Sequence, residues 1–104
     1  MEKYQVRNWV QETVENIFKG EIQEGILHNV KIVLEYDDEG GFWDSELCVK
    51  QLLYGKWEIC NFFKFSRYFK NYWKMVTDPW VCDMVTDITD VVCKFIREPK
   101  KMGW

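Results

Sequence analysis

The sequence predicts one α+β domain over residues 1–104, with an N-terminal helix, a three-stranded antiparallel meander, two C-terminal helices and a short tail at 99–104. Apolar residues recur every three or four positions near both ends of the chain, which is typical of amphipathic helices. In the middle they alternate with polar residues, which is typical of half-buried strands. The length of 104 residues, 47% of them hydrophobic and 17% aromatic, fits a single domain with a core of large side chains.

The first helix is predicted from Tyr4 to Phe18, because the apolar residues between them recur at helical spacing. The pair Lys19-Gly20 is expected to end it. The next stretch, 21–25, is mostly polar and is predicted as a connection.

Two strands are then predicted to form a hairpin over residues 29–36 and 43–53, which alternate between apolar and polar side chains. The stretch between them is acidic and contains glycine, as loops do. We expect the register that matches the apolar residues best: Tyr36 opposite Trp43, Ile32 opposite Leu47, and Val30 opposite Val49.

A third strand is predicted over residues 57–65, after a turn at Tyr54-Gly55-Lys56. Two registers are open, because a slip of one residue inverts the faces of a strand. A three-residue loop directs one set of side chains toward the core, namely Trp57, Ile59, Phe63 and Phe65. A two-residue loop directs the other set there, namely Glu58, Cys60, Phe62 and Lys64. We adopt the first register.

Two helices are predicted to follow the sheet. The first begins at Ser66, which can cap it, and runs to about Thr77. The second has Asp78 as its N-cap and Pro79 at its first position, and it ends before Pro99. Its apolar side chains fall on one arc: Val81, Met84, Val85, Ile88, Val91, Val92, Phe95 and Ile96.

Charge and hydropathy exclude several classes of protein. A net charge of −3 and a pI near 5.2 disfavour a general nucleic-acid binder. The charge is segregated, since residues 1–46 carry eleven acids and four bases whereas residues 47–104 carry six acids and ten bases. No stretch approaches the roughly 18 apolar residues that a membrane-spanning helix needs, and the first residues have no secretion signal. We therefore expect a cytoplasmic protein without membrane contact.

The cysteines and the single histidine offer little material for catalysis or metal binding. The four cysteines, Cys48, Cys60, Cys82 and Cys93, form no Cys-x-x-Cys pair. We therefore expect free thiols, no metal, no other cofactor and no catalytic residues. An enzyme with a Cys–His site built on His28 is the least favoured functional hypothesis.

The acidic loop between the first two strands is the main candidate binding site. Carboxylates there flank two aromatic residues, a composition typical of a protein-binding hot spot with a charged rim. The acids lack the spacing of a known calcium loop. A solvated loop tip is the alternative interpretation. The candidate residues are Asp37, Asp38, Glu39, Phe42, Trp43, Asp44 and Glu46.

Two further surfaces are predicted. A basic ridge for nucleic acid or another anion consists of Lys64, Arg67, Lys70 and Lys74. A solvated helix face explains this ridge equally well. The second face of the sheet carries apolar residues among charged ones, and we expect a homodimer through it unless the third helix covers it. This dimer face consists of Val33, Cys48, Leu52, Cys60 and Phe62.

The order of helix, three strands and helix over about residues 4–77 is similar to that of double-stranded-RNA-binding domains. Of that family's lysine-rich start to the second helix only Arg67 and Lys70 are present, and its glycine-proline-histidine loop has no counterpart, so its RNA contacts are not transferred. The small acidic chain, with a meander and two trailing helices, also resembles some phage anti-CRISPR inhibitors in architecture. That resemblance implies an inhibitor encoded by a phage or another mobile element.

These observations lead to three functional hypotheses. We expect a non-enzymatic protein-binding module, an anti-CRISPR-like inhibitor whose acidic loop occludes a basic, nucleic-acid-facing surface of its partner. A nucleic-acid-associated protein that uses the basic ridge is the alternative. A small Cys–His enzyme is the third.

Overall fold

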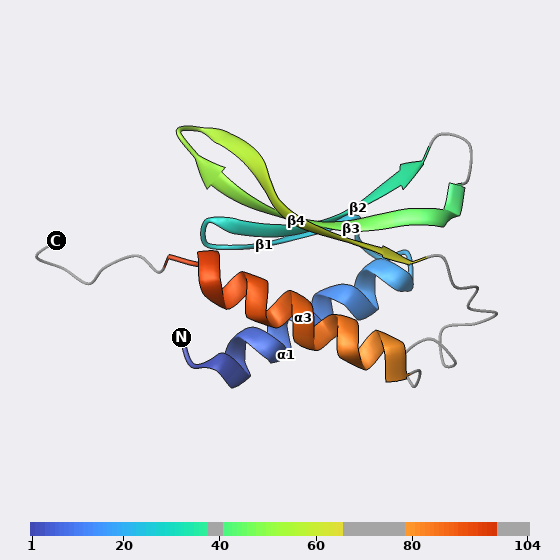
Figure 1. Cartoon of the computed structure of the whole chain (residues 1–104), viewed down its shortest axis with the longest axis horizontal. Coiled ribbons are helices and arrows are strands. Elements are labelled where there is room, and N and C mark those ends of the chain that lie inside the picture. Colours follow the sequence, from blue (N-terminus) through green and yellow to red (C-terminus); the bar gives the residue numbers. More distant parts are fainter. Residues whose placement is uncertain (38–40, 66–78, 98–104) are drawn as a thin grey trace, which may run out of the picture.

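The computed structural model describes residues 1–37, 41–65 and 79–97, and it confirms the α+β class. Four antiparallel strands form one sheet in the order β1-β2-β3-β4, and two helices lie together on one of its faces (Figure 1). The predicted helix that begins at Ser66 lies outside the described residues. The elements are α1 (Lys3–Phe18), β1 (Glu24–Leu27), β2 (Val30–Asp37), β3 (Gly41–Leu53), β4 (Lys56–Phe65) and α3 (Pro79–Phe95).

Helix α1 forms as predicted, because its apolar residues fall on one side. The backbone amide of Glu2 donates a hydrogen bond to Oε1 of Gln5 (2.8 Å), which is one half of a capping box. After the helix, Gly20 has a φ of 79°, a left-handed conformation that glycine adopts at low steric cost. The buried residues of the helix are Val6, Val10, Thr13, Val14 and Ile17.

The sheet has four strands instead of the predicted three, because β1 overlaps the stretch that the sequence predicts as a connection. Strand β1 pairs antiparallel with β2, and Gly25 lies opposite Ile32. The strand has only 4 residues, too few to show an alternating pattern, and a glycine occupies one of its helix-facing positions. The glycine lets α1 approach, since a Cβ at Gly25 would lie 2.6 Å from Cγ2 of Thr13.

The turn between β1 and β2 joins the sheet to the end of α3. His28 has a φ of 53°, the left-handed conformation that short hairpin turns require. Oδ1 of Asn29 accepts a hydrogen bond from the backbone amide of Arg97 (2.6 Å), and its Nδ2 donates one to the carbonyl of Phe95 (3.0 Å). One side chain thereby satisfies two backbone groups at the C-terminal end of a helix.

The β2–β3 register differs from the prediction by two residues. Ile32 lies opposite Val49, whereas the sequence predicts Leu47. The pairing is irregular between Glu35 and Asp37, so the register close to the connecting loop does not continue along the strands. Because the difference is even, each side chain keeps its predicted face. The other observed pairs include Val30 with Gln51, Leu34 with Leu47, and Glu35 with Glu46.

The turn between β3 and β4 has two residues, so the predicted three-residue loop is wrong. Tyr54 and Gly55 have φ values of 50° and 78°, and two successive positive φ angles match a type I′ turn. Leu52 lies opposite Trp57 and, like its neighbouring even-numbered residues of β3, points away from the helices. Trp57 therefore lies on the face opposite to the one predicted.

A β-bulge then restores the predicted faces farther along β4. Lys50 pairs with Ile59, but the next residue of β3, Val49, pairs with Asn61, so Cys60 is an inserted residue. Ile59 precedes the bulge, so the two-residue turn places it on the face away from the helices, which corrects its predicted place in the core. Phe63 lies on the helix-facing side and packs against the core, as predicted.

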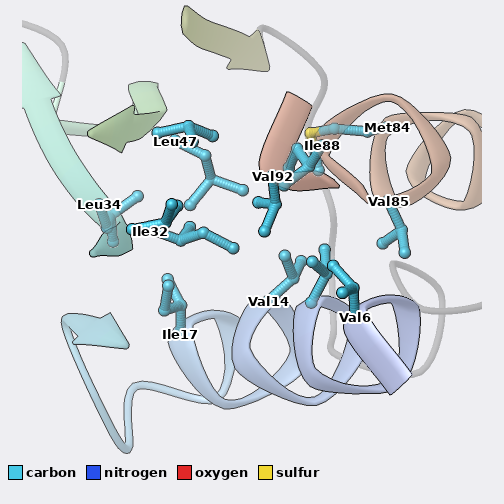
Figure 2. Packing of buried hydrophobic residues seen from close by; sticks show 13 residues of the cluster. Val6, Val14, Ile17, Ile32, Leu34, Leu47, Met84, Val85, Ile88 and Val92 are labelled. Atoms are coloured by element: carbon cyan, nitrogen blue, oxygen red, sulfur yellow. The ribbon is translucent and has the colours of Figure 1, made fainter. Parts of the chain in front are cut away.

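The core lies between the two helices and the face of the sheet that they cover. Figure 2 shows aliphatic side chains from α1, α3 and the central strands pointing toward one another. In α3, Met84, Val85, Ile88 and Val92 are buried, as the predicted apolar arc requires. In the part of the chain that the structure describes, neither helix is long and apolar enough to cross a membrane.

Candidate functional site

The acidic hairpin is our name for the predicted binding residues at the β2–β3 connection. Asp38 and Glu39 lie outside the described residues. For four others the structure describes the backbone alone, namely Asp37, Phe42, Trp43 and Asp44. Their backbone belongs to the sheet, with Asp37 paired opposite Gly41. The side chain of Glu46 is half-buried.

Two carboxylates lie opposite each other where the regular pairing of the acidic hairpin begins. Glu35 of β2 and Glu46 of β3 are cross-strand partners. Nζ of Lys50 lies 2.7 Å from Oε1 of Glu35, and this hydrogen-bonded lysine lowers the pKa of Glu35 below its usual value. The same contact raises the pKa of Lys50. Glu35 is therefore ionised at neutral pH, and it lies opposite a second glutamate across the two strands.

The basic ridge is described only at its first residue. The backbone of Lys64 lies in β4, opposite Glu46 of β3. The remaining predicted residues of the ridge, Arg67, Lys70 and Lys74, lie outside the described part of the chain. The described register thus places the start of the ridge beside the base of the acidic hairpin.

The face of the sheet that points away from α1 and α3 is called the outer face here. The register places Val33, Cys48 and Phe62 in one row across β2, β3 and β4, and Leu52 lies on the same face. Cys60 is the inserted residue of the bulge, and its Sγ lies 3.9 Å from Oε1 of Gln51. The structure therefore brings together four of the five residues predicted for a dimer face.

The sequence pattern does not place two apolar residues, Ile26 and Ile59, on the outer face. Ile26 lies in β1, a strand that the periodicity does not predict, and Ile59 precedes the bulge that inverts part of β4. The side chains of Ile26, Ile59 and Phe62 are 54%, 58% and 51% exposed. A glycine-containing stretch followed by two apolar residues, Ile26 and Leu27, is the signal that could have suggested a short edge strand.

The charged residues of the outer face pair within it. Nζ of Lys31 lies 3.2 Å from Oε2 of Glu24 and 4.7 Å from the centre of the Trp57 ring. The side chain of Lys31 is only 14% exposed and that of Lys50 only 20%. Lysine and aromatic side chains thus partly cover the strands from the outside.

The thiols are free, and burial makes two of them poor nucleophiles. Burial, followed by the nearby Glu35 carboxylate, raises the pKa of Cys48 to about 11. Burial also raises the pKa of Cys60. His28 lies in the exposed β1–β2 turn, and Cys82 is exposed on α3. Among the described side chains no cluster of histidine, cysteine and carboxylate groups has the arrangement of a metal site.

A small pocket lies between α1 and the first turns of α3. Its volume is about 40 Å³, and it is lined by polar and apolar residues of α1, including Arg7 and Phe18, and by Cys82 and Val85 of α3. Nη1 of Arg7 donates a hydrogen bond to Oγ1 of Thr86 beside it (2.7 Å). Ligand sites usually have about 300–1,000 Å³, so this pocket has room for water rather than for a substrate.

No protein-family model matches this chain, and searches of curated proteins and of solved structures each gave no match.

Proposed function

We propose that this chain is a protein-binding module that acts without catalysis and recognises a basic surface of its partner through the acidic hairpin. The observation that carries the proposal is the placement of Glu35 opposite Glu46 at the base of this hairpin. Like charges directly opposite each other repel across an antiparallel pair, and this pair lies next to the acids of the connecting loop.

Further acidic residues lie next to these two glutamates in the sequence. Asp37, Asp38 and Glu39 follow the base of the hairpin along the chain, and Asp44 precedes its return. The ammonium group of Lys50 lies against Glu35, on the side of the base away from these acids. A dense negative potential at one end of a sheet accelerates encounters with a positively charged partner, by roughly tenfold to a thousandfold at low salt.

The proposal has a specific form. In the cytoplasm, an inhibitor of this kind would occlude a basic, nucleic-acid-facing groove of its partner, in which carboxylates replace phosphates. Phe42 and Trp43, between the acids in the sequence, would supply the apolar anchor that a charged rim surrounds.

The test is affinity capture from host lysate with the wild-type chain and two charge-matched variants. One variant neutralises the hairpin with Asp37→Asn, Asp38→Asn and Glu39→Gln. The control neutralises three acids on the helices with Glu12→Gln, Asp83→Asn and Asp87→Asn. We expect a captured protein that the hairpin variant loses and the control retains, with association that slows as salt increases.

Two results would contradict this function. Equal recovery of all captured proteins by both variants would mean that the acidic hairpin is a solvated turn. Binding of the wild-type chain to bare DNA or RNA, with a steep loss of affinity in salt, would favour the nucleic-acid hypothesis and its basic ridge.

A further inference from the structure

Strand β4 forms the long edge of the sheet. It has 10 residues, whereas β1 at the other edge has only 4, and in the part of the chain that the structure describes no further strand pairs with β4. Its exposed residues include Lys56, Glu58, Ile59, Asn61 and Phe62. A long edge strand with exposed apolar side chains is a template on which a strand of another chain can pair.

The hydrogen-bond pattern of the sheet shows which backbone amides of β4 face away from β3, toward what is called the open edge here. The amide of Leu52 donates a hydrogen bond to the carbonyl of Asn29 (2.7 Å), so the even-numbered residues of β3 direct their backbone groups toward β2 and the odd-numbered residues toward β4. The β4 partners of the odd-numbered residues include Glu58, Asn61 and Phe63. The residues of β4 whose amides face the open edge therefore include Trp57, Ile59 and Phe62.

The bulge interrupts the spacing of the open-edge amides. In a regular strand such amides recur at every second residue, as those of Trp57 and Ile59 do. The inserted residue Cys60 moves the next one to Phe62, three positions farther along. An incoming strand with regular spacing can therefore follow the open edge on one side of the bulge but not across it.

The side chain of Asn61 then occupies the first open-edge amide after the bulge. Its Oδ1 accepts a hydrogen bond from the backbone amide of Phe62 (2.8 Å). Strand addition depends on backbone hydrogen bonds, so an amide that already has an acceptor is not available to an incoming strand. This acceptor lies beside the side chain of Phe62, which is 51% exposed.

We propose that the bulge at Cys60 and Asn61 is a built-in block that prevents β4 from pairing with a strand of another chain. The bulge restricts an incoming strand to a few residues, and the Asn61 side chain occupies the donor at which pairing beyond the bulge would begin. The block acts at the edge of the sheet and is independent of partner recognition by the acidic hairpin. It keeps the exposed Ile59 and Phe62 out of a continuous sheet between chains.

The test compares the full chain with two edge variants and one control, by amide hydrogen exchange and sedimentation equilibrium. Asn61→Val removes the acceptor. A second variant combines Asn61→Val with the deletion of Cys60, which restores regular spacing and leaves the flanking residues on their present faces. The control Asn8→Val makes the same side-chain change at an exposed position of α1. Circular dichroism confirms that each variant is folded.

At low concentration, we expect the Phe62 amide of the wild-type chain to exchange at least roughly tenfold more slowly than the amides of Trp57 and Ile59. In Asn61→Val this difference should disappear. At high concentration the variant without Cys60 should associate, and its open-edge amides should become protected at the same time. The wild-type chain and Asn8→Val should show no such protection.

Two results would overturn the proposal. One is protection of the Trp57 and Ile59 amides in the wild-type chain as its concentration rises, because its edge would then already accept a strand. The other is a variant without Cys60 whose open-edge amides exchange as in the wild-type chain at every concentration. If that variant does not fold, the Phe62 amide of Asn61→Val decides, since unchanged exchange there would mean that the Asn61 side chain does not occupy the donor.

Discussion

The two faces of the sheet are built from alternate residues of the same strands, yet they are covered in different ways. On the inner face Val30, Ile32, Leu47 and Val49 are fully buried under α1 and α3. On the outer face the large apolar residues are half exposed and lie among paired lysines and glutamates. The inner face therefore contains the packed core, whereas the outer face leaves large apolar side chains half exposed.

The largest expected effect is the difference in the free energy of unfolding between an isoleucine-to-alanine substitution on the inner face and one on the outer face. Ile32→Ala on the inner face should lower the free energy of unfolding by about 2–5 kcal/mol, because it leaves a cavity that the close-packed helices cannot fill. Ile59→Ala on the outer face should lower it by less than about 1 kcal/mol in the monomer. Urea unfolding of both variants at low protein concentration measures the difference. Equal losses would mean that the two faces contribute alike to the fold.

The next effect tests how closely the inner face is packed at its edge. In Gly25→Ala the new methyl group meets Cγ2 of Thr13, so we expect a loss of about 1–3 kcal/mol in the free energy of unfolding. Thr13→Ser removes that Cγ2 and keeps the hydroxyl group. The double variant should therefore be more stable than the sum of the single effects predicts. Strict additivity would show that α1 and β1 do not touch at this point.

A third effect comes from the buried thiol on the outer face. The pKa of Cys48 rises from an ordinary value of 9.0 to about 11 on folding. The unfolded chain therefore loses this proton at lower pH than the folded chain does. The stability that the neutral thiol contributes is complete below pH 9 and is lost as the pH rises through 11, by roughly 3 kcal/mol at most.

The measurement compares the free energy of unfolding of the wild-type chain and of Cys48→Val across this alkaline range. The valine variant should show a smaller decrease with pH, since its remaining pH dependence comes from other groups. If both proteins lose stability in parallel, Cys48 is open to water, and the outer face covers its own strands less well than described.

The smallest effect concerns the ion pairs of the outer face. Lys50 lowers the pKa of Glu35, so the pair stabilises the fold above the ordinary carboxyl pKa of 4.5 and stops doing so as the pH falls through the lower folded value. Glu35→Gln should cost less than about 1 kcal/mol at neutral pH, because the pair is partly exposed to solvent. Its effect should shrink in high salt. A loss that salt does not change would point to packing rather than charge.

The alternation and helical periodicity of the sequence predict most of the fold. They predict α1, α3 and three of the four strands, and they place Val33, Cys48 and Phe62 on one face away from the core. These patterns predict the elements correctly because each pattern extends over many residues and identifies the buried side of its helix or strand. The even error in the β2–β3 register left this assignment intact.

What the sequence does not predict depends on single residues. Strand β1 is too short to show a period. Its Gly25 is needed because Thr13 of α1 lies where a Cβ would be, and no local pattern shows that contact. A two-residue turn moves Ile59 to the outside, and one inserted residue, Cys60, returns Phe63 to the inner face. The hydrogen bonds of Asn29 to the end of α3 join residues far apart in sequence, and no local pattern records them.

The most direct test of the contrast between the two faces is the thermal midpoint of unfolding of two variants that introduce the same charge, Leu47→Glu on the inner face and Phe62→Glu on the outer face. Phe62 is 51% exposed, so the glutamate in its place remains in contact with water, and the midpoint should change by no more than roughly 8 °C. Leu47 is fully buried, so the glutamate in its place is an unpaired charge in the core, and the midpoint should fall by several times as much. Similar midpoints in the two variants would contradict the account.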